Sequence, residues 1–412
     1  MSSILKTLSR FHVKEIYLML AYLFYFLFFF IYFLFKFFFI KEKNIFLNHT
    51  GSFGHQIIAF ELIARFPKKF GKFFCFEYAV KSRTNNHLFK IYQKYFTTKL
   101  MVFRTRPIAK IACDASNKSM GMITLIYKKK VFTLGDLYEM SLKTIKHQYV
   151  MYHENTKKLE KRMPTIFLDK ILKKSLLSHK LPKDEEKKCI EALKAINIDL
   201  KNKKIANIVF RKNFSNLSKS KEFYYDTLRN SFKEENYIKT INWLISKNYV
   251  VFIRGASNKA TINKKIIDKK NIIFVEDMEY KIEIDKIHLY LMLNSSLNIC
   301  QHSGITIFFA VIGKAFSVLD AFPFCNSFVE NNKKNMKILY PSVLIKNKKM
   351  KISQLLNTKY FWGEGFEKNK LLANTENEIF NTITDTKLKR TKKLNFPMYS
   401  EARDRKNINL YY

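Results

Sequence analysis

The chain has 412 residues and a formal net charge of +40, from 74 Lys and Arg against 34 Asp and Glu. This length suffices for two packed domains. The basic residues are spread along the chain rather than gathered into one stripe with exposed aromatics, which argues against a specific nucleic-acid binder and favours an anionic membrane surface. Five cysteines without CxxC spacing exclude a disulfide framework and a zinc site. Three of them lie in apolar stretches and indicate reduced core residues of a protein that faces the cytosol: Cys75, Cys113 and Cys300.

The first long element is Ile16–Ile40, which is apolar apart from Lys36 and long enough to cross a bilayer as a helix. It has no small-residue cleavage site, so we do not expect a removable signal peptide. We predict that residues 1–44 form a single-pass membrane anchor, with a monotopic hairpin or interfacial segment as the alternative. Basic residues flank the segment on both sides and do not orient it. The cysteine pattern favours a cytoplasmic location for the catalytic part.

A strand, a glycine-containing turn and a helix are predicted next, within Asn44–Phe66. The strand is Ile45–Asn48, the turn is His49–Gly54 and the helix is His55–Phe66. The glycines let the turn fold tightly and let a ligand approach the backbone. His49 and His55 at the rim, with Glu61 on the helix, are candidate general bases, and a plain corner between strand and helix is the alternative.

The rest of the first half continues the alternation of strands and helices. Lys72–Tyr78 and Leu100–Phe103 are strand-like, and Asn85–Phe96 is helix-like. From Gly135 to Ile196 the pattern is mostly helical. The polar stretch Asp199–Lys204 is the predicted domain boundary, so we expect an α/β domain at 45–200, a second domain at 201–385 and a basic tail at 386–412.

The second half is more regular. Its expected strands and helices alternate, which indicates a doubly wound parallel sheet: strands at Ile205–Phe210, Tyr249–Ile253, Ile272–Val275, Leu297–Cys300 and Ala315–Leu319, and helices at Tyr237–Lys247, Asp285–Asn294 with Asp285 as its N-cap, Ile305–Ile312 and Glu376–Thr384. The helix Ile305–Ile312 has no polar face and must be buried. Gly313 is expected to end it.

Polar residues follow these strands where each one ends. Arg211 follows the first strand, Arg254-Gly255 the second, Glu276-Asp277 the third and His302-Ser303-Gly304 the fourth. In a parallel sheet they share one edge, where helix N-termini bind phosphate. Two arginines and a glycine suit a diphosphate, and Glu276 or Asp277 suits ribose hydroxyls. The alternative is that the arginines form ion pairs with these carboxylates.

Several well-known motifs are absent from the sequence: HExxH, an EF-hand loop, an Asp-x-Asp pair after a strand, Walker A and GxGxxG. Their absence argues against a metal centre, a P-loop NTPase and a dinucleotide oxidoreductase. We therefore expect no metal and no cofactor other than the substrate itself.

Several blocks resemble a family of bacterial glycosyltransferases of the GT-B type that is linked to surface polysaccharide synthesis: IVFRKNFSN, DTLRN, YVVFIRGAS, CQHSGITIFFAVIGKAFSVLD and NTENEIF, with GSFGHQIIAFELIARF near the N-terminus. The resemblance extends over about two-thirds of the chain as scattered short blocks. The resemblance implies two Rossmann-like domains that face a cleft, and metal-independent transfer of a sugar from a nucleotide sugar to a glycan or lipid-linked acceptor.

The resemblance also implies roles for individual residues. Arg211, Arg254, Gly255, Ser303 and Gly304 would hold the nucleotide sugar, joined on positional grounds by Glu276 and His302. The turn with Gly51, Ser52 and Gly54 would line the acceptor side. An inverting transfer needs a base for the acceptor hydroxyl, with His55 first and Glu61 or His49 next. A different function remains open, a non-enzymatic basic protein at the membrane that binds nucleotide or nucleic acid.

Overall fold

The computed structural model describes two compact units, Met1–Lys146 and His147–Tyr412. Gly51, Ser52 and His302 lie outside the described residues, and for His49 and His55 only the backbone is described. The described residues are 13–36, 38–39, 41–42, 44–50, 53–65, 70–80, 85–127, 130–133, 137, 150–153, 158–161, 177–198, 200, 203–211, 232–279, 281–301, 303–321, 336–350, 354, 370–384, 393–394 and 408–409.

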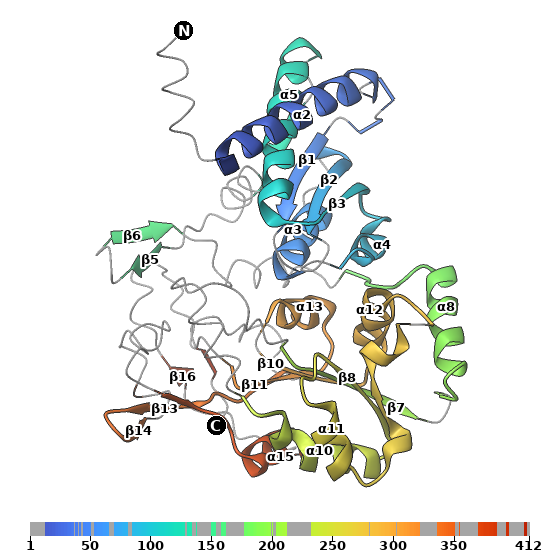
Figure 1. The fold of residues 1–412 in the computed structure, drawn as a ribbon, viewed down its shortest axis with the longest axis vertical. Coiled ribbons are helices and arrows are strands. Elements are labelled where there is room, and N and C mark those ends of the chain that lie inside the picture. Colours follow the sequence, from blue (N-terminus) through green and yellow to red (C-terminus); the bar gives the residue numbers. More distant parts are fainter. Residues whose placement is uncertain are drawn as a thin grey trace. The chain divides into compact units, whose positions relative to one another are not determined.

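Unit 1 is built on a four-stranded parallel sheet in the order β3-β2-β1-β4 (Figure 1). Right-handed crossovers from β1 to β2 to β3 place α3 and α4 on one face, and the return past β1 to β4 places α5 on the other. Its elements are α2 (Val13–Lys36), β1 (Asn44–Thr50), α3 (Phe53–Arg65), β2 (Phe73–Val80), α4 (Leu88–Tyr92), β3 (Thr97–Phe103), α5 (Arg106–Tyr127) and β4 (Lys130–Thr133).

Helix α2 is part of the core of unit 1. Phe29 and Phe33 are 1% and 0% exposed, in a cluster with sheet and α5 residues that include Phe76 and Met120. Helix α5 can lie close to these large rings because its buried side chains are mostly small, and Ser119 Oγ donates a hydrogen bond to the Phe26 carbonyl of α2 at 3.0 Å. Helix α2 therefore belongs to unit 1, and its role as a membrane anchor stays a prediction.

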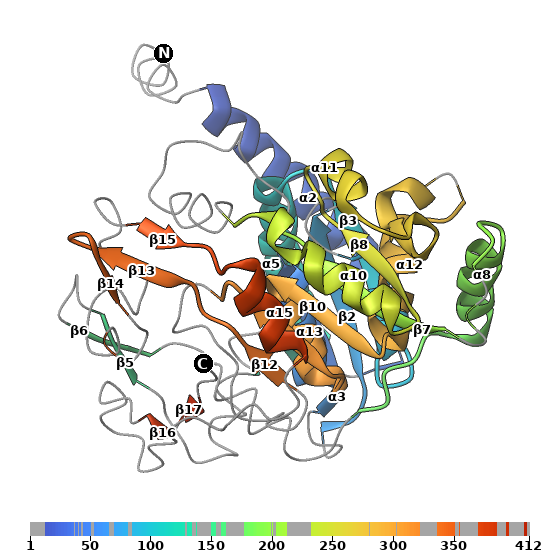
Figure 2. The same cartoon turned by 90° about the horizontal axis from the view of Figure 1, so that it is seen from below.

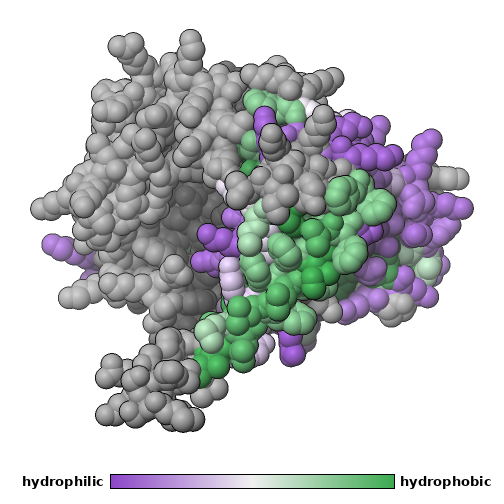
Figure 3. Space-filling model, turned by 90° about the horizontal axis from the view of Figure 1, so that it is seen from above, coloured by the Kyte–Doolittle hydropathy of each residue, from purple (hydrophilic) through white to green (hydrophobic). Residues whose placement is uncertain are grey.

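The same helix exposes apolar side chains on its outer side, and Figure 3 shows them as a band of apolar surface. The stretch Ile16–Lys36 is long and apolar enough to cross a membrane, a criterion of length and composition alone that signal sequences and core helices also meet. The helix was thus correctly predicted, but the side of it that carries Phe29 and Phe33 packs on the sheet and α5 as a core helix does.

Unit 2 contains a six-stranded parallel sheet in the order β12-β11-β10-β7-β8-β9. Counted along the chain, this is the 3-2-1-4-5-6 order of doubly wound nucleotide-binding folds, with its switch point between β7 and β10. Its strands are β7 (Lys204–Val209), β8 (Tyr249–Arg254), β9 (Ile272–Phe274), β10 (Leu297–Gln301), β11 (Phe316–Leu319) and β12 (Met336–Ile338). The α/β prediction with parallel sheets is confirmed.

Helices cover both faces of this sheet, with α12 and α13 on one and α10 and α15 on the other (Figures 1 and 2). The helices of the unit are α8 (Lys183–Lys194), η2 (Glu234–Tyr237), α10 (Ile238–Ser246), α11 (Lys259–Lys265), η3 (Lys269–Asn271), η4 (Val275–Met278), α12 (Ile284–Asn294), α13 (Gly304–Ile312) and α15 (Glu376–Thr384). Gly313 ends α13 with a φ of +68°, and the bounds predicted for α15 are confirmed.

The boundary between the units lies near Lys146, upstream of the predicted Asp199–Lys204. Helix α8, which was assigned to the first domain, packs on α12 instead, and Lys286 Nζ of α12 lies 3.1 Å from Glu185 Oε2. The mostly helical prediction for 135–196 is also wrong where the structure describes it as strand. Small sheets complete the unit, formed by β5 (Val150–His153), β6 (Lys158–Lys161), β13 (Ser342–Ile345), β14 (Lys348–Met350), β15 (Lys370–Leu372), β16 (Lys393–Leu394) and β17 (Ile408–Asn409).

Candidate functional site

The predicted strand-end residues of unit 2 gather at the carboxyl edge of its sheet. Arg211 follows β7 and Ser303-Gly304 follow β10, so these residues flank the switch point. Arg254 ends β8, one strand further out. A crevice forms at such a switch point because consecutive helices leave in opposite directions, and ligands of open α/β sheets bind there.

Buried amides hold the two central strands together below this edge. Asn207 and Asn298 are both 0% exposed and pair in register across β7 and β10, with 3.2 Å between Asn207 Nδ2 and Asn298 Oδ1. At the edge itself, the Arg211 backbone N–H donates to Gln301 Oε1 at 2.9 Å. These bonds fix the loop after β7 against the loop after β10.

Helix α13 begins at the switch point. Ser303 is its N-cap and accepts from the Ile305 N–H at 3.4 Å, and its carbonyl accepts from Thr306 Oγ1 at 2.6 Å. Gly304 is the first helical residue, so its N–H is one of the donors that have no intrahelical acceptor. The first turn of α13 contains no acidic residue. The site thus presents the positive end of a helix, with Arg211 in the loop after the neighbouring strand β7.

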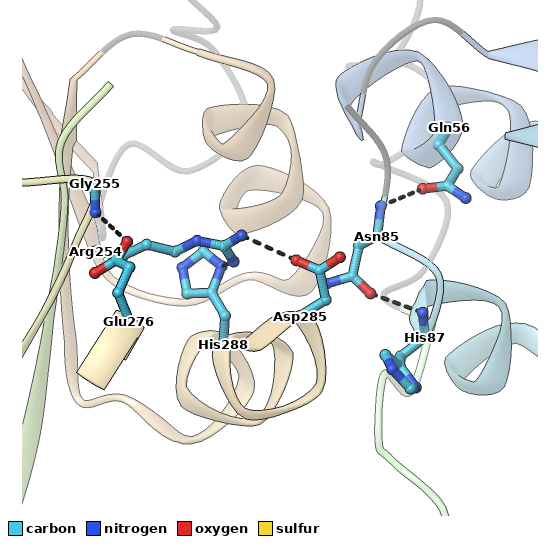
Figure 4. Close-up of polar contacts among 8 residues, drawn as sticks. All are labelled: Gln56, Asn85, His87, Arg254, Gly255, Glu276, Asp285 and His288. Atoms are coloured by element: carbon cyan, nitrogen blue, oxygen red, sulfur yellow. Dashed lines mark hydrogen bonds and ion pairs between the residues drawn. The ribbon is translucent and has the colours of Figure 1, made fainter. Parts of the chain in front are cut away.

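Arg254 is held by partners within unit 2 (Figure 4). Its Nη2 lies 2.9 Å from Asp285 Oδ1 and its Nη1 contacts His288 Nδ1. Burial first, and then the Arg254 charge, hold the pKa of His288 well below its usual value, so the ring accepts as a neutral imidazole. Arg254 therefore forms an ion pair, but with Asp285 and not with Glu276 or Asp277 as the alternative had it. Asp285 is in the first turn of α12, where Glu283 is the N-cap.

Gly255 has a φ of +80°, a conformation that favours glycine. Its N–H donates to Glu276 Oε1 at 2.8 Å, so this donor has a partner within unit 2. The second oxygen of Glu276, Oε2, is buried and has no hydrogen-bond partner within the described parts of the chain. Asp277 forms an ion pair with Lys259.

A buried polar network behind the switch point was not foreseen. Asp320 follows β11 and is 2% exposed. Its Oδ1 accepts from Asn374 N at 3.0 Å and Asn374 Nδ2 at 2.6 Å, and its Oδ2 accepts from Tyr237 Oη at 3.3 Å. Gln301 also hydrogen-bonds to Tyr237. The network therefore links the loop before α15 to the loop that carries Arg211.

Asp320 should make stability depend on pH. Burial raises its pKa to about 6, although Asn374 and Tyr237 oppose the rise by hydrogen bonding to the charged form. Because the pKa of Asp320 is higher in the folded than in the unfolded state, the folded state binds its proton more tightly. The stability that this proton binding contributes is fully present below about pH 4 and is lost as pH rises to about 6. Relative to Asp320→Asn, we expect the wild type to lose up to about 3 kcal/mol across that window. Urea unfolding at half-unit pH steps measures the difference, and parallel curves for the two proteins would contradict it.

The turn after β1 in unit 1 is shorter than predicted. His49 lies inside β1 and pairs with Tyr78 of β2, while Gly54 is the second residue of α3 and is buried. His55 lies in the first turn of α3, as expected. Beside it, Gln56 is fully buried, and its Oε1 accepts from the Asn85 N–H at 3.2 Å (Figure 4). Asn85 in turn accepts from the His87 N–H at 2.9 Å.

Glu61 is 0% exposed and links α3 to α4. Its Oε2 accepts from Arg65 Nε at 2.6 Å, and its Oε1 accepts from Tyr92 Oη at 2.6 Å. Burial, and then the Glu61 charge, raise the pKa of Tyr92 well above its usual value. An acceptor hydroxyl cannot reach a carboxylate that has no solvent-accessible surface, so this geometry favours a structural role for Glu61 over that of a base.

Replacing Glu61 with glutamine tests this role. The change leaves the Arg65 charge in a buried site without its carboxylate, so we expect a loss of about 3–5 kcal/mol in the stability of unit 1. Glu191→Gln in α8 is the matched control, because its pair with Lys187 is also spaced i,i+4 but is exposed and 3.8 Å long. The control should change stability by less than about 0.5 kcal/mol. Chemical denaturation measures both, and a changed pH–rate profile without lost stability would instead support a base.

Among the described residues no group of three or more His, Cys, Asp or Glu is placed to hold a metal ion. The metal independence of the reaction stays a prediction. The residues that sequence reasoning missed are mostly amides and partners of charged groups: Gln56, Tyr237, Gln301, His288, Asp320 and Asn374. For Asp320, the sequence offered one signal of a possible role, its position one residue past a predicted strand.

No protein-family model matches the chain, and no curated protein matches it. Similar solved structures include the glycosyl transferase family 9 protein from Veillonella parvula, with 10% identity, 82% of this chain and 95% of that chain covered and a TM-score of 0.48. E. coli ADP-heptose LPS heptosyltransferase II has 10% identity, coverage of 74% and 91% and a TM-score of 0.42. The wall teichoic acid polymerase TagF has 10% identity, coverage of 73% and 77% and a TM-score of 0.30.

Proposed function

We propose that the chain is a glycosyltransferase that moves a sugar from a nucleotide sugar to a surface glycan or lipid-linked acceptor at the membrane. One observation carries the proposal: the N-terminus of α13, capped by Ser303, begins beside Arg211 at the switch point of a 3-2-1-4-5-6 sheet. Both the position and the charge of this site suit a diphosphate. The sequence blocks that resemble glycosyltransferases of surface polysaccharide synthesis contain these same residues.

The chemistry of transfer matches what this site offers. When the bond between sugar and diphosphate breaks, negative charge builds on the leaving diphosphate. Arg211 and the helix N-terminus of α13 stabilise that charge most in the transition state, which is how such groups accelerate a reaction. We assign the ribose hydroxyls to the loop after β9 that carries Glu276, whose Oε1 accepts from the Gly255 N–H. No metal has a part in these steps as we propose them.

In unit 1 we assign the acceptor side to the turn after β1. An inverting transfer needs a base for the acceptor hydroxyl, and His55 in the first turn of α3 is our first assignment, with His49 second. His55→Asn is expected to lower turnover and remove one limb of the pH–rate profile while leaving nucleotide affinity unchanged. The cytoplasmic location of both units is part of the same proposal, because nucleotide sugars are supplied there.

The experiment is calorimetric titration of the full chain with UDP, GDP, CDP and ADP, followed by transfer assays with the corresponding nucleotide sugars and a membrane extract. We expect one nucleotide to bind well above the others and its sugar to be transferred. DNA binding that is steeply salt-dependent and survives Ser303→Ala, together with no nucleotide binding, would support the non-enzymatic alternative and reject the enzyme.

A further inference from the structure

Helix α2 has two apolar faces with different surroundings. The inner face packs on the sheet and on α5: the rings of Phe33 and Phe76 meet edge to face with centroids 4.9 Å apart, and those of Phe29 and Tyr78 do so at 5.8 Å. Tyr25 contacts Phe103 of β3 in the same way at 5.8 Å. These rings fill the core of unit 1 on that side of the sheet, so the fold of the unit depends on the helix staying in place.

The outer face is exposed along the whole length of the helix and continues beyond it. It carries large apolar side chains at the i, i+3, i+4 and i+7 spacing of one helix face, and Figure 3 shows them as a continuous band bordered by hydrophilic residues. Its members are Tyr17, Leu20, Leu23, Phe24, Leu27, Phe28, Ile31, Leu34, Phe35, Phe38 and Phe39, which are between 38% and 77% exposed. Such a band is far more apolar than the surface of a protein that lies in water alone.

A helix that crosses a bilayer has acyl chains on all sides of its central turns, and α2 cannot meet that condition while it is packed on unit 1. The neighbouring helix α5 exposes Lys110, Asp114 and Lys118, which would enter the hydrocarbon with it. If α2 left unit 1 to cross the bilayer alone, the side chains of Phe76 and Tyr78 in the sheet would lose their cover. Lying along the surface of one leaflet avoids both costs, because only the outer face then enters the lipid.

Charge favours a bilayer over a second copy of the chain as the occupant of this face. The chain carries a formal net charge of +40, so two copies repel each other, whereas a leaflet with anionic lipids attracts each copy. The helix itself is charged only near its ends, at Lys14, Glu15 and Lys36. Exposed Lys36 and Lys41 stand at the carboxyl end of the band, where they can reach the headgroups.

We infer that α2 lies in the plane of an anionic leaflet, with its outer face among the acyl chains and its inner face as a core helix of unit 1. The chain is then monotopic, and residues on either side of the helix lie on the same side of the membrane. The inference rests on the membrane attachment proposed above and is independent of sugar transfer. Nucleotide binding by the same samples therefore separates a failure of the enzyme proposal from a failure of this one.

Flotation of the full chain with vesicles tests the surface. We expect binding to phosphatidylglycerol-containing vesicles that is weaker on phosphatidylcholine alone and at high salt. The double variant Leu27→Ser/Phe35→Ser should lose at least tenfold in affinity. Its matched control, Ile190→Ser/Ile267→Ser, alters exposed apolar residues of unit 2 and should bind as the wild type does. Unchanged thermal unfolding shows that both variants fold, and equal binding by both would overturn the inference.

The depth of single tryptophans distinguishes lying from crossing. Leu20→Trp and Phe35→Trp are about 22 Å apart along the helix, with Leu27→Trp between them. In vesicles with brominated lipids, after subtraction of the signal of Trp243 and Trp362, a helix in the plane gives all three the same shallow depth. A profile that is deepest at Leu27→Trp would show a crossing helix, and a dimer lost in Leu27→Ser/Phe35→Ser with vesicle binding intact would show a self-association face. Either result would overturn the inference.

Discussion

Phe33→Ala is expected to destabilise unit 1 by about 3–5 kcal/mol, as large-to-small changes in a packed core do. Phe33 is 0% exposed and its ring packs on Phe76. Phe35, two residues further on the same helix, is 70% exposed. Phe35→Ala should therefore change the free energy of unfolding by less than about 0.5 kcal/mol in detergent solution.

The pair is measured by chemical denaturation of the full chain, following the transition of unit 1. Vesicle binding should rank the two variants the other way round. Phe35→Ala should weaken binding more than Phe33→Ala, because Phe35 is in the lipid-facing band and Phe33 is not. Equal, small losses of stability would show that α2 is an independent anchor and that its packing on the sheet contributes nothing to the fold.

Arg211→Ala is expected to lower kcat/KM for sugar transfer by about 10²- to 10³-fold, the usual cost of removing one group that stabilises charge in a transition state. Arg211 lies two residues after the end of β7, and its backbone N–H is bound to Gln301, the last residue of β10 before α13. The loss should fall on kcat more than on KM, because the diphosphate gains most of its negative charge as the bond breaks.

Lys204→Ala is the matched control for Arg211→Ala. Lys204 begins the same strand at the opposite edge of the sheet and is exposed, so its removal changes the net charge equally without touching the site. We expect its kcat/KM to stay within twofold of the wild type. Equal losses in the two variants would mean that general charge, and not the switch point, governs the reaction.

Most strands of unit 2, and the edge at which their carboxyl ends meet, could be predicted from the sequence. The strands from Ile205 to Leu319 and helix α13 emerged because each is a short apolar run between polar turns, and parallel pairing then brings their ends to one edge. The partner of Arg254 could not be foreseen. Asp285 is 31 residues away, and nothing local distinguishes a first-turn carboxylate that pairs with arginine from one that caps a helix.

Unit 1 was harder to predict because its packing contradicts simple expectations. Ile16–Ile40 has the composition of a free anchor, and only the small residues of α5 show that another helix approaches it. Those residues, Ala109, Ala112, Ala115, Ser116 and Ser119, recur at helical spacing and are all buried. Glu61 illustrates the same difficulty, since a carboxylate near a glycine turn suggests chemistry until Arg65 and Tyr92 are seen to hold it.

The most direct measurement is a crystal structure of the full chain soaked with the nucleotide sugar that calorimetry identifies. We expect density for its diphosphate at the switch point of unit 2, with phosphate oxygens within hydrogen-bonding distance of the Gly304 N–H group and the Arg211 guanidinium. A nucleotide bound at any other place, with the N-terminus of α13 unoccupied, would contradict the assignment of this edge as the donor site.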